Sequence, residues 1–183
     1  QGPTHIPCPH RAPEDRQRTD RCFRFTAPAG RPQRLTWVSL NAGILVWDSQ
    51  RTGKIISGRQ LFGSVSWWVF FDNCYQAFDT LDDNRDGKLT GAELDGISVW
   101  FDRNGNDMAD SGKIVLVYQL GVAALPCRAT GMDRAPPANF TGMRMTYGRE
   151  LPAFEWIASA VEPPEGTASV RPLRCSDLAQ HRR

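Results

Sequence analysis

A twelve-residue acidic stretch, Asp82–Glu93, constrains the fold of this chain more than any other part of the sequence. Oxygen-bearing side chains stand at its first, third and fifth positions, a glycine stands at its sixth, and a glutamate at its last. Alternate side chains of a tightly turning loop point toward one centre, and the glycine permits the positive φ that such a turn needs. The stretch therefore predicts a closed loop that gathers oxygen atoms around one point.

This spacing is that of the calcium loop of an EF-hand, and the alternative is a solvated acidic turn that matches by chance. Calcium takes six to eight oxygen ligands at about 2.3–2.6 Å. Lys88 would contribute its backbone carbonyl, Thr90 would bind directly or through water, and Glu93 would close the shell with both carboxylate oxygens. The predicted ligands of the Ca2+ ion are Asp82, Asn84, Asp86, Lys88, Thr90 and Glu93.

Two further stretches carry parts of the same pattern. Residues 48–59 keep Asp48 at the first position, but Arg59 stands where the closing carboxylate belongs, so we interpret this copy as a structural turn without metal. Residues 102–113 keep more of the ligands, although Lys113 replaces the closing glutamate. A weak second calcium site is predicted there, and a loop built only of turn-forming residues is the alternative. The candidate ligands of this second site are Asp102, Asn104, Asn106, Met108 through its carbonyl, and Asp110.

The pattern of apolar residues predicts an α+β fold. Apolar residues recur at three- and four-residue spacing over residues 67–81, which favours one amphipathic helix entering the central loop. Residues 97–101 alternate and are rich in β-branched side chains, which favours a strand. Further strands are predicted at 35–40, 44–47, 114–118, 122–125, 143–147 and 154–157, with a loop at 131–142. Because the second and third loops start only 20 residues apart, the two long helices that link ordinary EF-hands have no room.

The two ends of the chain differ in composition from its middle. Residues 1–32 are rich in proline and arginine and predict an extended or disordered arm, and residues 163–183 predict a flexible tail. A single calcium-binding domain is expected over 33–162. The five cysteines show no metal-binding spacing; Cys8 with Cys22 and Cys127 with Cys175 are possible disulfides, which leaves Cys74 as a buried residue in a helix.

Several other functions find little support in the sequence. The sequence contains no run of about 18 apolar residues and therefore predicts no membrane-spanning helix. The three histidines lie in the predicted arm and tail, so a histidine-assisted nucleophile is not supported and we expect no enzymatic activity. Two alternatives stay open. One is a glycan-acting hydrolase that uses Glu150 and Glu155 as paired carboxylates, and the other is nucleic-acid binding through the arginine-rich ends.

The order of loops and short strands between residues 37 and 125 resembles an EF-hand-like calcium-binding module of bacterial exported and surface proteins, such as the EF-hand-like region of RTX-like haemolysin-type proteins. In this chain the resemblance rests on the run from LVWD at 45–48, through QLFG at 60–63 and LDDN at 81–84, to DRNGN at 102–106. It implies a secreted or cell-surface protein in which Ca2+ has a structural or adhesive role. The partner would be a protein or glycan surface, and the resemblance implies no enzymatic role.

Overall fold

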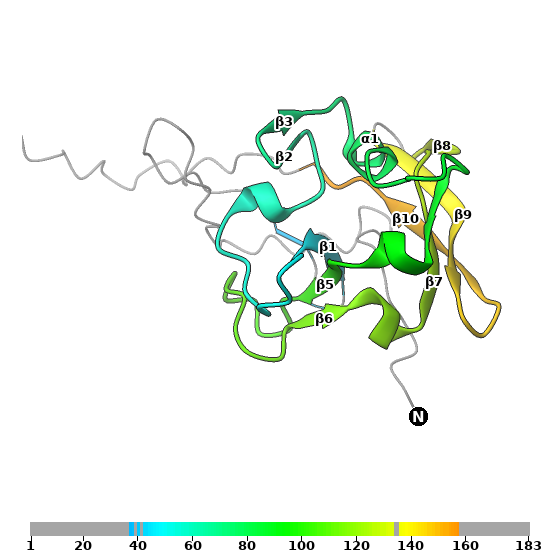
Figure 1. The fold of residues 1–183 in the computed structure, drawn as a ribbon. Coiled ribbons are helices and arrows are strands. Elements are labelled where there is room, and N and C mark those ends of the chain that lie inside the picture. Colours follow the sequence, from blue (N-terminus) through cyan, green and yellow to red (C-terminus); the bar gives the residue numbers. More distant parts are fainter. Residues whose placement is uncertain (1–36, 39, 41, 134–135, 158–183) are drawn as a thin grey trace, which may run out of the picture.

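The computed structural model describes residues 37–38, 40, 42–133 and 136–157, and its described part is predominantly β (Figure 1). It contains ten strands in three sheets and a single short α-helix, α1 (Cys74–Asp79). The predicted α+β class is therefore wrong. Apart from α1, the segments that join the loops are strands and short 3-10 helices. The predicted arm (1–32) and tail (163–183) lie outside the described residues.

A three-stranded antiparallel sheet has the order β1-β5-β6. It consists of β1 (Gly43–Trp47), β5 (Ile97–Phe101) and β6 (Ile114–Leu116). Every residue of β5 is buried, including Ser98, the one polar side chain among four large apolar ones. The strands predicted at 44–47 and 97–101 are confirmed within one residue, whereas the strand predicted at 114–118 turns after Leu116 into the 3-10 helix η4 (Val117–Leu120).

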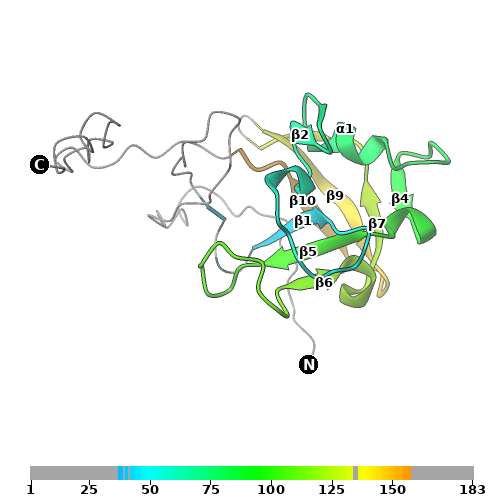
Figure 2. The same ribbon diagram turned by 60° about the vertical axis from the view of Figure 1, so that its left-hand side comes forward.

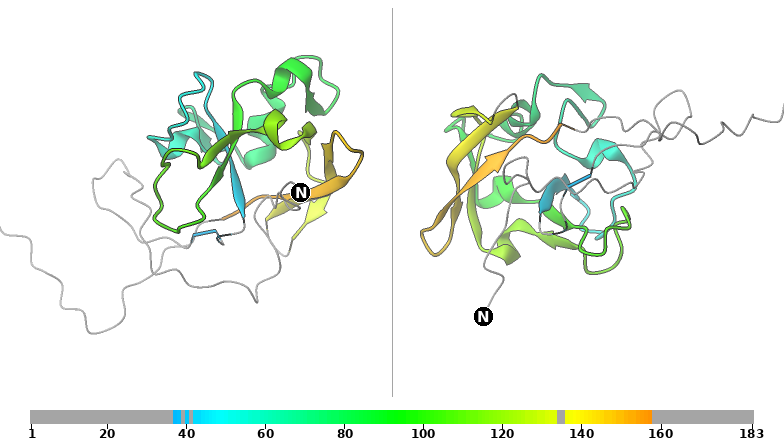
Figure 3. Two further views of the ribbon diagram at one scale, coloured as in Figure 1. Left: turned by 90° about the horizontal axis from the view of Figure 1, so that it is seen from below. Right: turned by 180° about the vertical axis from the view of Figure 1, so that it is seen from behind.

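A larger antiparallel sheet has the order β10-β9-β7-β4, with β8 paired to β9. Its strands are β4 (Lys88–Thr90), β7 (Val122–Pro126), β8 (Gly131–Met132), β9 (Pro137–Met145) and β10 (Glu150–Phe154). The predicted loop at 131–142 is wrong, because most of it belongs to β8 and β9. Figure 3 shows β9 and β10 running together along one side of the molecule.

The main core lies between these two sheets (Figure 2). Leu45, Ile97 and Val99 of the smaller sheet belong to one buried cluster with Leu125 and Met143 of the larger sheet. A second, smaller cluster packs Trp37 edge-on against Trp100, with 5.3 Å between the ring centroids. Within the described ranges, no helix has the length and apolar character needed to cross a membrane.

The helix predicted over residues 67–81 is wrong in its first half. Residues 65–70 form a tight hairpin of β2 (Val65–Ser66) and β3 (Val69–Phe70), in which Trp67 and Trp68 have φ of 52° and 70°. The helix begins only after Asn73, whose side chain accepts the N–H groups of Tyr75 and Gln76 and so caps the first turn. The spacing of the aromatic residues in this stretch matched a helix although half of it is a turn.

The strand predicted at 35–40 is not observed in the residues of this stretch that the structure describes. Residues 37 and 38 have no regular structure and residue 40 lies in a turn, while 35, 36 and 39 are outside the described residues. Trp37 and Val38 are nevertheless buried, so the apolar character of the stretch predicts its packing better than its backbone.

Candidate metal centre

The loop Asp82–Glu93 connects α1 to the edge of the larger sheet. Its seventh to ninth residues form β4, which pairs antiparallel with β7 so that Leu89 lies opposite Leu125. Both leucines are fully buried. The 3-10 helix η3 (Gly91–Leu94) then carries Glu93 back over the loop. The apolar residue at the eighth position therefore anchors the polar loop in the core.

The first residue of the loop, Asp82, organises the backbone of the turn. Its carboxylate accepts the N–H of Asp86 at 3.1 Å and the N–H of Gly87 at 2.7 Å, and the side chain is almost fully buried. The turn requires positive φ at Arg85 (60°) and at Gly87 (84°), the second of which glycine adopts without strain. The carboxylate thus holds the loop closed through backbone donors.

The remaining predicted side-chain ligands are fixed by short hydrogen bonds along the same turn. Oδ1 of Asn84 accepts the N–H of Asp86 at 2.9 Å, and Oδ1 of Asp86 accepts the N–H of Lys88 at 3.0 Å. Glu93 spans the loop: one carboxylate oxygen accepts the Asn84 N–H at 3.3 Å and the other accepts the Thr90 N–H at 2.9 Å. Both ends of the loop are therefore tied to the closing carboxylate.

Several carboxylates lie close enough to a buried thiol under the loop to affect its pKa. Cys127 lies directly beneath the loop, where its N–H donates to the carbonyl of Gly87 at 3.0 Å. Burial, and then the nearby carboxylates of Asp82, Asp79, Glu93 and Asp86, raise the pKa of the Cys127 thiol to about 12. A concentration of carboxylates in a loop with fixed oxygen donors is the chemistry that a hard divalent cation requires.

The oxygen atoms of this loop are of the types that bind calcium, although its carboxylates do not form a tight cluster. Among the described residues, no group of three or more His, Cys, Asp or Glu side chains is close enough to form a metal-binding group. Asn84, the Lys88 carbonyl and Thr90, which would complete the shell, are neutral oxygen donors. Glu93 is hydrogen-bonded to backbone N–H groups, and Asn84 and Asp86 are exposed at the loop surface. Ligation would require small rotations of these side chains toward the loop centre.

The two partial copies adopt the same backbone turn as the central loop. The fourth position has positive φ in all three, at Arg51 (52°), Arg85 (60°) and Gly105 (60°). The sixth position does so as well, at Gly53, Gly87 and Asp107, with φ of 65°, 84° and 58°. In each copy the carboxylate of the first Asp, which is buried, accepts the N–H groups of the fifth and sixth residues. These leading residues are Asp48, Asp82 and Asp102.

Loop 48–59 keeps this turn, and the contacts of its described residues place no positively charged side chain against Asp48. The hydroxyl of Thr52 donates to the carboxylate of Asp48 at 3.0 Å. Arg59, at the closing position, places its guanidinium 3.4 Å from the centre of the Trp68 ring instead. The N–H of Asp48 donates to the Gly96 carbonyl at 2.7 Å, so this loop packs against the exit of the central loop.

Loop 102–113 brings its predicted oxygen donors together around the ammonium group of Lys113. Nζ of Lys113 donates to the carboxylate of Asp102 at 2.9 Å, the side-chain oxygen of Asn104 at 2.6 Å and that of Asn106. It also donates to the Met108 carbonyl at 2.9 Å and lies 3.3 Å from Asp110 Oδ2. The residues predicted to bind metal in this loop therefore contact a side-chain cation of the chain itself.

The surroundings of Asp102 keep it ionised. Burial acts to raise its pKa, but hydrogen bonds from Lys113, from the Asp107 N–H and from the Trp37 indole, together with the charge of Lys113, hold the pKa below its usual range. The Trp37 Nε1–H donates to Oδ2 of Asp102 at 3.0 Å. Sequence reasoning did not identify Trp37 as part of this loop, because the contact joins residues 65 positions apart.

The two glutamates proposed as a hydrolase pair are not brought together. Glu150 is exposed at the start of β10 and Glu155 follows its end. Five steps along an extended strand put about 16 Å between the Cα atoms of its end residues, whereas the two carboxyl groups of a glycosidase lie roughly 5–9.5 Å apart. The arginine-rich ends invoked for nucleic-acid binding lie outside the described residues.

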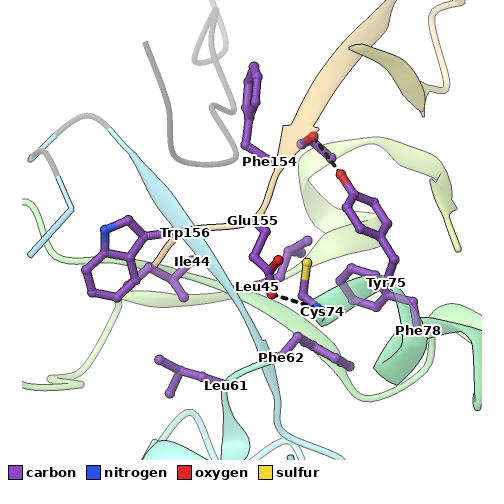
Figure 4. Close-up of a pocket in the computed structure, with 11 residues that line it drawn as sticks. Ile44, Leu45, Leu61, Phe62, Cys74, Tyr75, Phe78, Phe154, Glu155 and Trp156 are labelled. Carbon is purple, nitrogen blue, oxygen red and sulfur yellow. Dashed lines mark hydrogen bonds between the residues drawn. The ribbon is translucent and has the colours of Figure 1, made fainter. Parts of the chain in front are cut away.

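Glu155 instead lines a small apolar pocket of about 60 Å³ between β1, α1 and the end of β10 (Figure 4). Its carboxylate accepts the N–H of Cys74 at 2.9 Å, and Tyr75 donates its hydroxyl to the Ala153 carbonyl. Burial raises the pKa of Glu155, and the Cys74 hydrogen bond opposes that rise. This carboxylate connects the start of α1 to the end of the larger sheet.

Cys74 lies at the start of α1 and is buried, as the sequence predicted. Cys127 is a buried thiol among the described residues, and its suggested disulfide with Cys175 stays a prediction. Cys8, Cys22 and Cys175 lie outside the described residues, so the Cys8–Cys22 pairing stays a prediction.

Comparisons with known proteins add two findings. A family model described as an SPM domain matches residues 17–150. The iron-regulated protein FrpA of Neisseria meningitidis serogroup C is 30% identical over 94 residues, which is 49% of this chain and 8% of that protein. The chain therefore spans a small fraction of the length of this curated relative. Neither description denotes an enzymatic activity.

Proposed function

This chain belongs to the SPM domain family, and from the geometry of one of its loops we propose that it is a calcium-binding module in which Asp82–Glu93 holds one Ca2+ ion. The observation that carries the proposal is the conformation of the loop. Asp82 and Glu93 hold its first and last turns through backbone donors, and the oxygen-bearing residues between them follow the calcium-loop spacing. Much of the ordering that binding requires is therefore present in the folded chain.

Each predicted ligand has a distinct task in this proposal. Asp82 brings a buried negative charge to the base of the loop, and its backbone hydrogen bonds fix the direction of the carboxylate. Asn84 and Asp86 present side-chain oxygens on successive short turns. Thr90 and the carbonyl of Lys88 lie at the start of η3 and in β4, where pairing with β7 fixes the backbone. Glu93 closes the loop from η3. A bound Ca2+ ion would supply two positive charges and bind these oxygens together.

The role proposed for the ion is structural. The loop joins α1 to β4 and η3, so a cation shared by Asp82 and Glu93 would tie these elements to the edge of the larger sheet. A ligand that binds only the folded state stabilises it by about 2.7 kcal/mol at a hundredfold excess over Kd. Three carboxylates with neutral oxygen donors favour the Kd range of extracellular modules, about 10⁻⁴–10⁻³ M.

The setting that we propose is secreted or cell-surface, and it follows from this affinity and from the EF-hand-like resemblance. Calcium is abundant enough outside cells to saturate a site of this affinity. A structural or adhesive module of this kind would present its surface to a protein or a glycan, and it would carry out no reaction of its own.

Calcium titration of the chelator-treated full chain by calorimetry tests the proposal. We expect one equivalent of Ca2+ to bind and the melting temperature to rise with calcium concentration. Glu93→Gln removes one charged ligand and is expected to weaken binding about 100-fold, which corresponds to about 2.7 kcal/mol.

Asp83→Asn is the matched control for Glu93→Gln. Asp83 is exposed and occupies the second position of the same loop, a position that supplies no ligand. This variant therefore removes one negative charge but should weaken binding only slightly. The proposal is contradicted if Glu93→Gln and Asp83→Asn have equal affinities, or if the chelated chain melts at the same temperature with and without calcium.

A further inference from the structure

We propose that Lys113 is a built-in cation that replaces the metal ion in loop 102–113, so that this loop is closed permanently and independently of calcium. The inference goes beyond calcium binding by the central loop and does not require it. It rests on the contacts of one ammonium group with oxygen atoms contributed by five residues of the loop.

The position of the ammonium group within the loop is the first argument. Asp102, Asn104 and Asn106 occupy the first, third and fifth places, and each directs a side-chain oxygen at Nζ of Lys113. The Met108 carbonyl, at the seventh place, does the same at 2.9 Å. These are the places that supply oxygen atoms to calcium in a loop of this kind. The ammonium group therefore lies where the ion would lie.

The charge and burial of the site are the second argument. The Asp102 side chain is 2% exposed, and a carboxylate so deeply buried is costly without a partner. The Lys113 side chain is only 12% exposed, so its charge is largely withdrawn from solvent and matched by Asp102 and Asp110. An ammonium group has three donors, and the oxygens around it outnumber them, so every N–H can be satisfied.

The third argument is what the ammonium group holds in place. The loop joins β5 to β6, and the carbonyl of Lys113 accepts the Phe101 N–H at 2.9 Å across its neck. Asp102 in turn accepts the Trp37 indole, which links the loop to the second core cluster. Neutralising Asp102 from within the chain thus stabilises the β5–β6 hairpin and its contact with the tryptophans.

A melting experiment in excess chelator tests the proposal without reference to calcium. Lys113→Met keeps the apolar part of the side chain and removes the charge, leaving Asp102 unpaired. We expect the melting temperature to fall by roughly 5–10 °C. Lys54→Met is the control, because Lys54 is an exposed lysine of loop 48–59. Equal melting temperatures for the two variants would overturn the proposal.

A reciprocal experiment asks whether the loop keeps the geometry of a cation site. Lys113→Glu restores a carboxylate at the closing position and is made together with Glu93→Gln, which weakens the central loop. We expect the double variant to bind one equivalent of Ca2+ more tightly than Glu93→Gln alone, and to melt at a higher temperature with calcium than without. No gain in calcium affinity would overturn the proposal.

The unsubstituted chain provides a readout that does not depend on the folding of any variant. It has three lysines, Lys54, Lys88 and Lys113, of which the first two are exposed. Under native conditions with chelator, an amine-acylating reagent should modify Lys54 and Lys88 at least about tenfold faster than Lys113, whose ammonium group is enclosed by oxygen atoms. In denaturant the three rates should converge. Equal native rates would contradict the enclosed ammonium group.

Discussion

The loops at 82–93 and 102–113 have the same backbone turn but opposite charges at the closing position. Both have a buried leading Asp that accepts the N–H groups of the fifth and sixth residues, and both have positive φ at the fourth and sixth positions. Glu93 ends the first loop and Lys113 ends the second. The leading Asp and the two positive-φ residues are therefore enough to set the turn, and we propose that the twelfth residue selects the cation.

Loop 48–59 extends the comparison, since it keeps the turn while Arg59 points to Trp68 and Thr52 donates to Asp48. The shared turn therefore accommodates different side-chain partners of its leading carboxylate, a hydroxyl group in loop 48–59 and an ammonium group in loop 102–113. For this reason, motif spacing alone does not predict whether a given copy would bind metal.

Transfer of the lysine to the central loop should have the largest effect. In Glu93→Lys, we expect the ammonium group to reach the oxygens of Asp82, Asn84 and Asp86, as Lys113 does in its own loop. The calcium-dependent rise in melting temperature, roughly 8 °C for a stabilisation of about 2.7 kcal/mol, should disappear. Scanning calorimetry with calcium or chelator measures this, and a retained calcium response would show that the closing residue does not select the cation.

A smaller effect is expected from the sixth position. Gly87→Ala places a side chain at φ of 84°, with no neighbouring atom closer than the Arg128 Nε at 3.9 Å, so the cost comes from backbone strain, about 1–2 kcal/mol. Asp107→Gly at the equivalent position should change the free energy of unfolding by less than about 1 kcal/mol, because Asp already tolerates this conformation. Urea unfolding in chelator compares the two variants. Equal losses would contradict a shared turn.

The contribution of loop 102–113 to the free energy of unfolding should also depend on pH in the acid range. Because the pKa of Asp102 is lowered in the folded state, its contribution to stability is complete above the unfolded Asp pKa of about 3.9 and is lost as the pH falls below it. In Lys113→Met the pKa of Asp102 should lie closer to, or above, the unfolded value. We therefore expect the free energy of unfolding of this variant to fall less steeply between about pH 4 and pH 2 than that of the original chain. Parallel curves would show that Lys113 does not hold Asp102 ionised.

The smallest effect is expected where loop 48–59 meets the exit of the central loop. Arg51 pairs with Asp95 at 3.0 Å, and both side chains are more than half exposed. Arg51→Ala should lower the free energy of unfolding by no more than about 0.5 kcal/mol and leave calcium affinity within about twofold. Calorimetry of this variant shows whether loop 48–59 supports the central loop, and a large loss of affinity would mean that it does.

The sequence predicted the parts of the fold that depend on local pattern. The β-branched run 97–101 formed β5, and the strands at 44–47 and 122–125 were placed within one residue of β1 and β7. The helix at 67–81 failed because aromatic residues at helical spacing also suit a hairpin whose two tryptophans occupy its turn. The loop at 131–142 failed because the pairing of β9 with β8 and β10 overrides its prolines and glycines.

For the candidate site, the sequence identified which oxygen donors share a loop but not what they contact. Asp102, Asn104, Asn106, Met108 and Asp110 were grouped correctly by spacing. The replacement at Lys113 was interpreted as a lost ligand, because a one-dimensional pattern does not show that a long side chain can turn inward. The indole of Trp37 and the thiol of Cys127 come from distant parts of the chain, where spacing carries no signal.

The most direct test is a crystal structure of the full chain grown with calcium, in which anomalous scattering locates the ion. We predict one Ca2+ ion, within about 2.3–2.6 Å of oxygen atoms from Asp82, Asn84, Asp86 and Glu93. We predict no ion in loop 102–113, where Nζ of Lys113 should lie among the same oxygens as described above. An ion bound in loop 102–113 with Lys113 displaced, or no ion in loop 82–93, would contradict the account.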